Sequence, residues 1–390
     1  MKKEKVIFMK KRTIGLVMIT SPYVGGVFQY ENLIAEAIWN NRDKYNMIMV
    51  CDNSYWINWC IERNVKFIEG KMGMYKGSIE FAKNHPYIAA LYSSFFSPQI
   101  KKIKEEKIEL LVYGQQGMFL ASKLIKQLCP IHDLMHRYET RFMERQQSKE
   151  DNIFRCELQF VTTVMVDSQL GKSQVIESYL QKRKKRPFIQ VLPYVVSEHI
   201  TDSKEEPVQT PDKYIFYPAQ FWQHKNHLNL LKAVGILKKD IPDIHLILVG
   251  SEKNALNTIK EYIKENEMES FVTIYNFVSE EKLIYLYRHA AAMVMPSYFG
   301  PTNIPPLEAM ALGCPAAVSN NYAMGEQVGD AGLLFDPDSP KEIADCISKL
   351  WNDSRLRETM REKGYQQIAK WRPKDFEKRL IETIDITLGI

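Results

Sequence analysis

The sequence predicts an α/β protein with two doubly wound domains that face each other across a cleft. Three observations support this prediction. The chain has 390 residues, enough for two domains that each bury their own core. Short β-rich runs alternate with helical patterns along the whole chain, as in parallel sheets covered by helices on both faces. A polar segment at residues 197–212 separates two such series and is expected to link the domains.

The first series precedes this linker. It begins with an apolar run at residues 13–20, which predicts a strand. A turn that contains Gly25 and Gly26 follows, and a helical pattern then covers residues 27–40. Later strands are expected at residues 47–51, 110–113, 164–166 and 189–192, and helices at 83–106 and 171–181.

The second series begins directly after the linker. Strands are expected at residues 214–218, 245–249, 272–276 and 292–295, and helices at 227–239, 252–267 and 279–289. A further helix is opened by Pro305-Pro306 and ended by Gly313, and a short apolar run starts at Pro315. Amphipathic helices follow at 341–352 and 354–370, and a last helix runs from Pro373 towards Thr387. The expected units are an N-terminal domain at 1–200, a C-terminal domain at 201–372 and a separate helix at 373–390.

Composition indicates a soluble globular protein of the reducing cytoplasm. Apolar residues make up 45% and charged residues 25%, which is average for globular proteins. No apolar run reaches the roughly 18 to 20 residues that span a bilayer. Lys10, Lys11 and Arg12 interrupt the first apolar segment, which argues against a cleaved signal peptide. The six cysteines are scattered, with no CxxC pair and no zinc spacing, and are expected to be free thiols.

Positive charge is concentrated in two runs, at residues 2–12 and 182–186, although the net charge is only +5. Such runs are either solvated surface or a contact for an anionic membrane or a pyrophosphate-linked lipid. The second interpretation places the protein peripherally on the inner face of the membrane. Nucleic acid is not expected as a partner, because no aromatic residues are interleaved with the basic ones.

The most informative segment is residues 296–315. An apolar strand at 291–295 runs into a loop rich in Gly, Pro, Thr and Asn, and the loop opens the helix at Pro305-Pro306. Glu308 lies in the first turn of this helix, at the carboxyl end of a strand, where open α/β sheets bind ligands. Backbone N–H groups there can face phosphate, and the carboxylate can accept hydrogen bonds from hydroxyls. The segment therefore predicts a nucleotide-sugar site.

Two further clusters lie where strands are followed by helices. Gly25 and Gly26 allow a ligand to approach the backbone and the helix N-terminus, although a tight turn without a ligand fits them equally well. Lys225 follows the first strand of the second domain and is placed to reach an anion in the cleft, or is simply solvated.

The third cluster contains His132 and Asp133. The pair could be a general base with its orienting carboxylate, a metal site, or a helix start capped by Asp133. Adjacent helical residues do not face each other, which favours the cap together with one substrate contact. Ser168 is a natural helix cap, and Lys172 after it faces phosphate or solvent. No acidic metal-binding loop or catalytic signature is present, so a metal-independent site without a cofactor is expected.

Together these segments resemble the retaining glycosyltransferases of family 4, which have the GT-B fold of two facing Rossmann-like domains. The resemblance covers nearly the whole chain and is strongest at residues 214–371. The matching motifs occur in the family's order: Gly25-Gly26, Asp133 after His132, Ser168 after Asp167, Asn226 after Lys225, and Ile304-Pro305-Pro306-Leu307-Glu308-Ala309. In that fold the last helix crosses back to the N-terminal domain, which fits residues 373–390.

The resemblance implies roles for these residues. Lys225 would neutralise the donor diphosphate, Glu308 would bind the ribose hydroxyls, and His132 would contact the transferred sugar near its reactive carbon. These three residues form the expected catalytic set. The expected donor-binding set is Gly25, Gly26, Ser168, Gln220, Lys225, Thr302, Asn303, Ile304, Pro305, Leu307 and Glu308. In such enzymes the leaving diphosphate helps to remove the acceptor's proton, so positioning and electrostatic stabilisation carry the reaction.

Two positions depart from the family pattern. Gln220 stands where the family usually has an arginine, and Gly300 stands where it has a glutamate, eight residues before Glu308. Thr302 and Asn303 could instead donate to the sugar or the phosphate. The resulting loop, FGPTNIPPLE, is interpreted as a variant of the donor site found among bacterial polysaccharide enzymes.

The expected function is that of a hexosyltransferase. It would move a sugar from a nucleoside diphosphate sugar to a cell-envelope polysaccharide or lipid-linked glycan, with retention and without metal. Two alternatives remain: a nucleotide-sugar 2-epimerase of the same fold, and a non-catalytic GT-B subunit that binds a partner.

Overall fold

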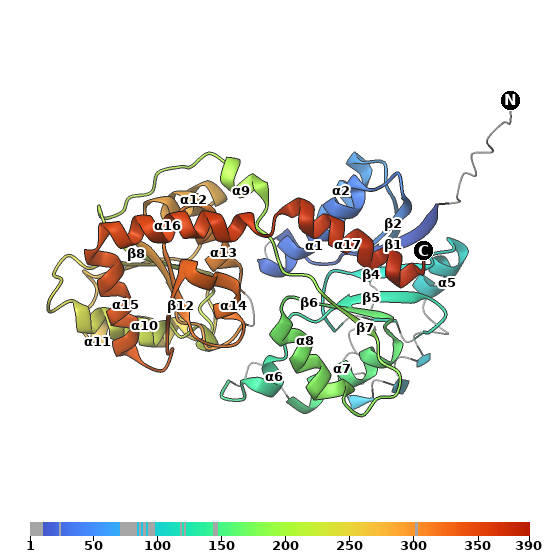
Figure 1. The fold of residues 1–390 in the computed structure, drawn as a ribbon, viewed down its shortest axis with the longest axis horizontal. Coiled ribbons are helices and arrows are strands. Elements are labelled where there is room, and N and C mark those ends of the chain that lie inside the picture. Colours follow the sequence, from blue (N-terminus) through green and yellow to red (C-terminus); the bar gives the residue numbers. More distant parts are fainter. Residues whose placement is uncertain are drawn as a thin grey trace.

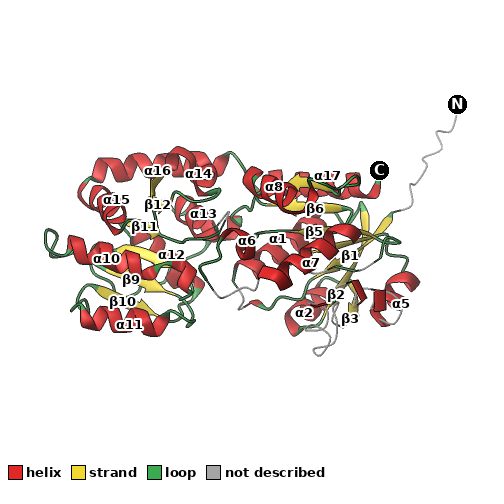
Figure 2. Ribbon diagram, turned by 90° about the horizontal axis from the view of Figure 1, so that it is seen from below, coloured by secondary structure: helices red, strands yellow, loops and turns green. Residues whose placement is uncertain are grey.

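The computed structural model describes residues 11–22, 25–70, 84–85, 87–88, 91–92, 98–117, 119–120, 122–142, 147–300 and 303–390. Two parallel sheets lie side by side, one in each half of the chain (Figure 1). Helices cover both faces of each sheet (Figure 2). The fold is therefore α/β with two Rossmann-like doubly wound domains, as predicted. Among the described residues, no helix combines the length and apolar character needed to cross a bilayer.

The N-terminal sheet has the strand order β3-β2-β1-β4-β5-β6-β7 in the described part of the chain. Its strands are β1 (Arg12–Val17), β2 (Tyr45–Cys51), β3 (Lys66–Glu69), β4 (Leu110–Tyr113), β5 (Lys126–Pro130), β6 (Thr163–Val166) and β7 (Phe188–Val191). The order reverses between β1 and β4, and ligands bind beyond the carboxyl ends of the strands at such a switch point. The helices are α1 (Gly26–Asn40), α2 (Ser54–Glu62), α5 (Pro98–Glu105), α6 (Met135–Tyr138), α7 (Gln147–Phe160), α8 (Gln169–Val175) and a π-helical turn (Ile176–Leu180).

The C-terminal sheet has the order β10-β9-β8-β11-β12-β13 and reverses between β8 and β11. Its strands are β8 (Ile215–Pro218), β9 (Leu246–Val249), β10 (Val272–Tyr275), β11 (Ala292–Met295), β12 (Ala316–Ser319) and β13 (Gly332–Phe335). The helices are α9 (Glu198–Asp202), a 3₁₀ turn (Gln223–Lys225), α10 (His227–Leu237), α11 (Leu256–Glu265), α12 (Glu280–His289), α13 (Ile304–Ala311), α14 (Met324–Val328), a second 3₁₀ turn (Gly329–Ala331), α15 (Pro340–Asn352) and α16 (Ser354–Ala369).

The last helix, α17 (Pro373–Leu388), leaves the second domain and packs on the first, against α1 and β5 (Figure 1). Phe376, Leu380 and Ile384 are fully buried in the same core cluster as α1. Polar contacts fix the helix at both ends: Glu377 accepts from Asn41 Nδ2 at 2.8 Å, and Thr387 bonds Thr163 at 2.8 Å. The core of the N-terminal domain is therefore completed by the last helix.

Local sequence explains where the helices start. Five helices begin with an N-cap side chain that accepts a hydrogen bond from a backbone N–H of the first turn. These N-cap residues are Asn53, Ser168, Ser279, Ser339 and Asp353. Proline occupies the first turn of α13, α15 and α17, where its missing N–H costs nothing.

The sequence-based prediction missed several elements and misplaced one. The elements α2, β3, β5 and α7 were not predicted, and α9 lies inside the predicted linker. The expected helix at 171–181 starts at Gln169 and is α-helical only to Val175. Of the expected helix at 83–106, α5 is described, and much of the remainder lies outside the described residues.

Candidate functional site

The first half of the site is the N-terminus of α13, at the carboxyl end of β11. Asn303 is the residue before the helix, and Lys225 Nζ donates to its side-chain Oδ1 at 3.1 Å. Gln327 of α14 holds the backbone of Asn303 from both sides. Its Oε1 accepts from the Asn303 N–H at 3.0 Å, and its Nε2 donates to the Asn303 carbonyl at 2.7 Å. A lysine and the positive end of the α13 dipole are therefore fixed in one place, which suits an anion, although Pro305 and Pro306 contribute no N–H to it.

Glu308 lies one turn further along α13 and is only 5% exposed. It accepts a hydrogen bond from Tyr287 Oη at 2.8 Å. Burial raises the pKa of Glu308, and hydrogen bonds from Tyr287 and from Gln29 of the other domain oppose this shift. Both donors supply the kind of hydrogen bond that a ribose hydroxyl would supply.

The Lys225 loop is anchored by Asn226, which is 5% exposed and adopts a left-handed backbone with φ +58°. Its Nδ2 donates to the carbonyls of Pro296 at 2.9 Å and Pro337 at 2.8 Å. These bonds tie the loop after β8 to the chain after β11 and β13. Gln220, in the position of the family arginine, is engaged by Trp222, whose Nε1 donates to its Oε1 at 2.9 Å.

Gly300 shows why no glutamate stands at the upstream position. Its φ is +134°, which disfavours any residue with a side chain. A Cβ atom at Gly300 would also overlap the side-chain amide of Asn303. Asn303 thus fills the space into which a side chain at position 300 would project.

The second half of the site belongs to the N-terminal domain. Gly25 has φ +79° and precedes α1. A Cβ on Gly26 would come within 2.9 Å of Ile304 Cδ1, so the glycine turn lies directly against the start of α13. One turn into α1, Gln29 Oε1 accepts from Tyr194 Oη at 3.2 Å. The two helix N-termini therefore meet across the domain boundary.

His132 follows β5 and is oriented by Asp167, which follows β6. The distance from His132 Nδ1 to Asp167 Oδ2 is 3.3 Å. Burial lowers the pKa of His132, but the neighbouring Asp167 carboxylate outweighs burial and the pKa is raised. His132 Nε2 is buried, and a backbone contact with Gly114 adds to the increase in the pKa of the ring.

The predicted N-cap at Asp133 is wrong, because the N-cap of α6 is Leu134 and no side chain caps this helix. Asp133 lies one residue earlier and forms a turn. Its Oδ1 accepts from the N–H of Met135 at 3.0 Å, at the start of α6. The side chain of Gln116 holds the same turn, because its Oε1 accepts from the His132 N–H at 2.8 Å and from the Asp133 N–H at 3.1 Å. The carboxylate that orients His132 is therefore Asp167 and not its neighbour in sequence.

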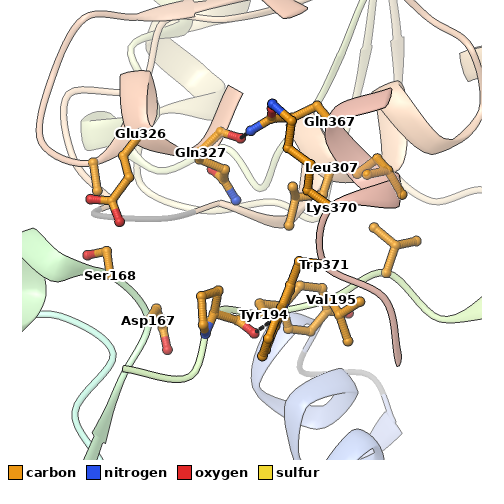
Figure 3. Close-up of a pocket in the computed structure, with 14 residues that line it drawn as sticks. Asp167, Ser168, Tyr194, Val195, Leu307, Glu326, Gln327, Gln367, Lys370 and Trp371 are labelled. Carbon is orange, nitrogen blue, oxygen red and sulfur yellow. Dashed lines mark hydrogen bonds between the residues drawn. The ribbon is translucent and has the colours of Figure 1, made fainter. Parts of the chain in front are cut away.

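A cavity of about 220 Å³ lies between the domains beside these residues (Figure 3). Asp167 and Ser168 lie on its N-terminal side, and Leu307, Glu326 and Gln327 lie on its C-terminal side. Ser168 caps α8, as expected, by accepting from the Gly171 N–H at 3.0 Å.

The structure thus groups the predicted residues in three places. Gly26, Lys225, Asn303, Ile304 and Glu308 lie around the start of α13. Pro305 belongs to the same turn, with its carbonyl 3.5 Å from Tyr287 Oη. Ser168 and Leu307 line the cavity, and His132 adjoins it through Asp167. Thr302 lies outside the described residues.

Three contributors escaped the sequence-based prediction: Gln29, Tyr194 and Gln327. Gln29 could have been found from its position one turn after Gly26, but no motif marks the other two. Among the described residues, no group of three or more His, Cys, Asp or Glu side chains is placed to hold a metal ion. Independence from metal stays a prediction.

Comparison with known proteins agrees with this geometry. Residues 199–367 match the family model of the glycosyl transferases group 1. O-antigen chain mannosyltransferase B of Escherichia coli is 31% identical over 159 residues, which cover 40% of this chain and 42% of that protein. This chain therefore matches less than half of that relative's length.

Solved structures match over nearly the whole chain. Sucrose-phosphate synthase from Thermosynechococcus elongatus superposes with a TM-score of 0.72 at 16% identity, covering 97% of this chain and 100% of that one. WaaG, a glycosyltransferase involved in lipopolysaccharide biosynthesis, superposes with a TM-score of 0.70 at 14% identity, with coverage of 97% and 100%. At 16% and 14% sequence identity, the similarity to these two structures shows a shared fold alone.

The two facing sheets and the two-sided site between them define the class: this is a GT-B protein. Within that class, residues 199–367 match the group 1 glycosyltransferases, the type of family 4 that the sequence motifs predicted.

Proposed function

We propose that this protein transfers a sugar from a nucleoside diphosphate sugar to a hydroxyl of a cell-envelope polysaccharide or lipid-linked glycan, with retention and without metal. The observation that carries the proposal is the arrangement at the start of α13. There Lys225, the helix N-terminus and Glu308 lie together, against the glycine turn of the other domain.

The diphosphate would bind between Lys225 and the N-terminus of α13, where Ile304 supplies a backbone N–H and Pro305 and Pro306 supply none. The ammonium group and the helix dipole both attract negative charge, and their effect grows as charge develops on the leaving phosphate. Asn303 holds the lysine at 3.1 Å, and Gln327 holds Asn303, so little reorganisation is needed when the anion arrives. Asn303 would then share its side chain between Lys225 and the donor.

The ribose would exchange hydrogen bonds with Glu308, in place of those that Gln29 and Tyr287 supply in this structure. Because Gln29 belongs to the opposite domain, we expect the cleft to open slightly when the nucleotide enters. The flexible Ile304 side chain, which touches Gly26, can move without a change in the backbone.

His132 would contact the transferred sugar through Nε2, and because this nitrogen is buried here, the contact requires the neighbouring chain to move when the sugar binds. Asp167 fixes the ring through Nδ1 and favours the protonated imidazole. The His132 imidazolium would orient the sugar hydroxyls close to the reacting carbon. The leaving diphosphate would take the proton from the acceptor hydroxyl.

The relatives suggest which donors to test first. The relatives include O-antigen chain mannosyltransferases of Escherichia coli and Salmonella typhimurium, which match about two fifths of this chain. A GDP-linked or UDP-linked hexose is therefore the first choice. A panel of nucleotide sugars, assayed for donor hydrolysis and for stabilisation of the folded protein, would identify the base and the sugar.

Two variants test the site itself. Replacing Lys225 or Glu308 by Ala should lower the transfer rate by about 10²- to 10³-fold, the usual effect of losing a group that stabilises transition-state charge. Lys260→Ala and Glu261→Ala on the exposed face of α11 are matched controls and should leave the rate unchanged. Wild-type rates in either site variant would refute the assignment.

The alternatives give different results in the same assays. An epimerase would convert UDP-GlcNAc to another sugar nucleotide with no acceptor present. A non-catalytic subunit would hydrolyse no donor. Replacing Lys225 or Glu308 by Ala would then leave the measured activity unchanged.

Membrane contact is a separate part of the proposal. In the run at 182–186, four of the five basic residues are exposed, and Phe188 beside it is 44% exposed. Cosedimentation with vesicles that contain anionic lipid should weaken when Lys184 and Lys185 are both replaced by Glu. Equal binding of both proteins would count against this surface.

A further inference from the structure

We propose that the buried carboxyl of Glu157 is a positioning residue for His132, and that it acts through the loop at residues 114–117 while it remains neutral. The proposal rests on the proposed function, in which His132 contacts the transferred sugar. It adds to that function a group in the interior of the N-terminal domain. Glu157 lies in the last turn of α7, and its carboxyl faces Cys129 of β5.

The carboxyl of Glu157 is enclosed by the protein. The residue is fully buried, and neither side-chain oxygen has a hydrogen-bond partner among the described residues. An ionised carboxylate in this place would have lost its water without gaining a partner, which is costly. The group avoids this cost by keeping its proton at neutral pH. Burial accordingly raises the pKa of Glu157 to about 8.

The groups that face Glu157 supply no positive charge in the described part of the chain. The Gly117 N–H and the Cys129 thiol favour the ionised form, but burial outweighs both in setting the pKa of Glu157. Arg183 acts on the neighbouring Cys156 and not on Glu157. The titratable groups that interact with the carboxyl all have a pKa raised by burial and are neutral themselves: Cys129 of β5, Tyr113 of β4 and Cys156 of α7.

One end of the loop at residues 114–117 rests on α7. Gly117 adopts a left-handed backbone with φ +73°. A Cβ atom there would lie 3.9 Å from Ile153 Cγ2, one helical turn before Glu157. Glycine is the residue that adopts this backbone without strain, and it places the N–H of the turn towards the carboxyl.

The rest of the loop holds His132. Gln116 Oε1 accepts from the backbone N–H of His132 at 2.8 Å and from that of Asp133 at 3.1 Å. Gly114 contacts the ring through its backbone and adds to the increase in the pKa of His132. Because the loop touches the histidine at two residues and the carboxyl at a third, a displacement of the loop from α7 would also displace the imidazole.

Ionisation of Glu157 would cause such a displacement. The carboxylate would need water or new hydrogen-bond donors, and these can reach it only when α7 or the loop moves. The imidazole of His132 would then leave its position beside the sugar, and small errors in position lower the rate of an enzyme steeply. Glu157 therefore sets an upper pH limit on activity that is separate from the loss of the proton of His132.

The first test needs no transfer reaction. The imidazole of His132 is titrated by NMR from neutral to alkaline pH in the wild type and in Glu157→Gln. Glutamine keeps a carbonyl oxygen for the Gly117 N–H but cannot ionise. The wild-type signal should show two inflections, one from the ring itself and one near pH 8 from Glu157, whereas the variant should show only that of the ring.

The stability of the same two proteins checks that Glu157 ionises in the interior. The folded protein keeps this proton up to about pH 8, whereas the unfolded chain releases it near pH 4.5. The unfolded state therefore binds fewer protons between these values, and the stability of the wild type falls as the pH rises. The urea midpoint of the wild type should accordingly decrease relative to that of Glu157→Gln across this interval.

The second test measures transfer. Glu157→Leu fills the same space without an acceptor atom and should lower kcat by about tenfold or more at neutral pH, with little change in the KM for the donor. Glu157→Gln should restore most of this loss, and its kcat should lack the decrease near pH 8 that the wild type shows. Glu177→Gln, exposed on the π-helical turn, is the matched control and should follow the wild type at every pH.

Two results would overturn the proposal. One is an identical titration of His132 in the wild type and in Glu157→Gln. The other is a folded Glu157→Leu protein with the kcat and the His132 signals of the wild type, because Glu157 would then only fill space. If Glu157→Leu does not fold, the titration decides alone. Failure of the proposed function is seen separately, since the wild type would transfer no sugar at any pH while the two inflections of His132 would remain.

Discussion

Replacing Gln327 by Leu should both destabilise the C-terminal domain and weaken nucleotide binding. The leucine keeps most of the side-chain volume but removes the hydrogen bonds at 3.0 and 2.7 Å that hold the Asn303 backbone. At about 1 kcal/mol for each bond, the free energy of unfolding should fall by about 2 kcal/mol. For a domain of this size the melting temperature should fall by about 4 to 8 °C.

The effect on binding follows from the same two bonds. Without them Asn303, which accepts from Lys225 at 3.1 Å, is no longer fixed before the nucleotide arrives. If ordering it costs about 1 kcal/mol, the Kd for the nucleoside diphosphate should rise about fivefold. Differential scanning fluorimetry gives the melting temperature, and isothermal titration calorimetry gives the Kd.

Gln366→Leu, on the exposed side of α16, is the matched control and should change the stability by no more than about 0.5 kcal/mol. If the Gln327 variant melts and binds nucleotide like this control, the argument that Gln327 positions the donor site is refuted.

Three other predictions concern different parts of the chain. Asp167→Asn should lower the pKa of His132, because burial lowers this pKa and the carboxylate that raises it is gone; an NMR titration of the imidazole measures it. A histidine whose pKa is higher in the folded than in the unfolded protein stabilises the fold at pH values below the unfolded pKa. This stabilisation is lost as the pH rises through the folded pKa. The difference in free energy of unfolding between wild type and variant, measured with urea, should therefore be largest in acid and become smaller towards alkaline pH. Phe376→Ala should cost about 3 to 5 kcal/mol in urea unfolding, because α17 contributes this fully buried ring to the N-terminal core, and wild-type stability would contradict that placement. Asn226→Ala should cost about 3 kcal/mol by the same measurement, from two lost hydrogen bonds and a left-handed backbone, and a loss below about 1 kcal/mol would count against the anchor.

Much of the fold could be predicted from the sequence because buried parallel strands are short apolar runs. Leu110–Tyr113 and Ala292–Met295 were predicted to the residue. The strand Lys126–Pro130 was missed because its sequence, KQLCP, begins with Lys and Gln and ends in Pro. Its Gln127 is fully buried and bonded to Tyr113 and Leu120, which only the folded structure reveals.

That missed strand also hid part of the site. Because β5 pairs with β6, the residues that follow their carboxyl ends lie side by side. His132 and Asp167 were each singled out from the sequence, but without β5 nothing brought them together. Tyr194 and Gln327 carry no motif: the role of Tyr194 depends on how the two domains meet, and that of Gln327 depends on how α14 packs beside α13.

The position of α17 has a consequence for synthesis. The helix that completes the first domain's core is synthesised after the whole second domain, so the first domain emerges from the ribosome with an apolar face uncovered. Such contacts between distant parts of a chain slow folding and expose surfaces that aggregate. We expect the nascent first domain to require a chaperone, and the two domains to become stable together rather than one after the other.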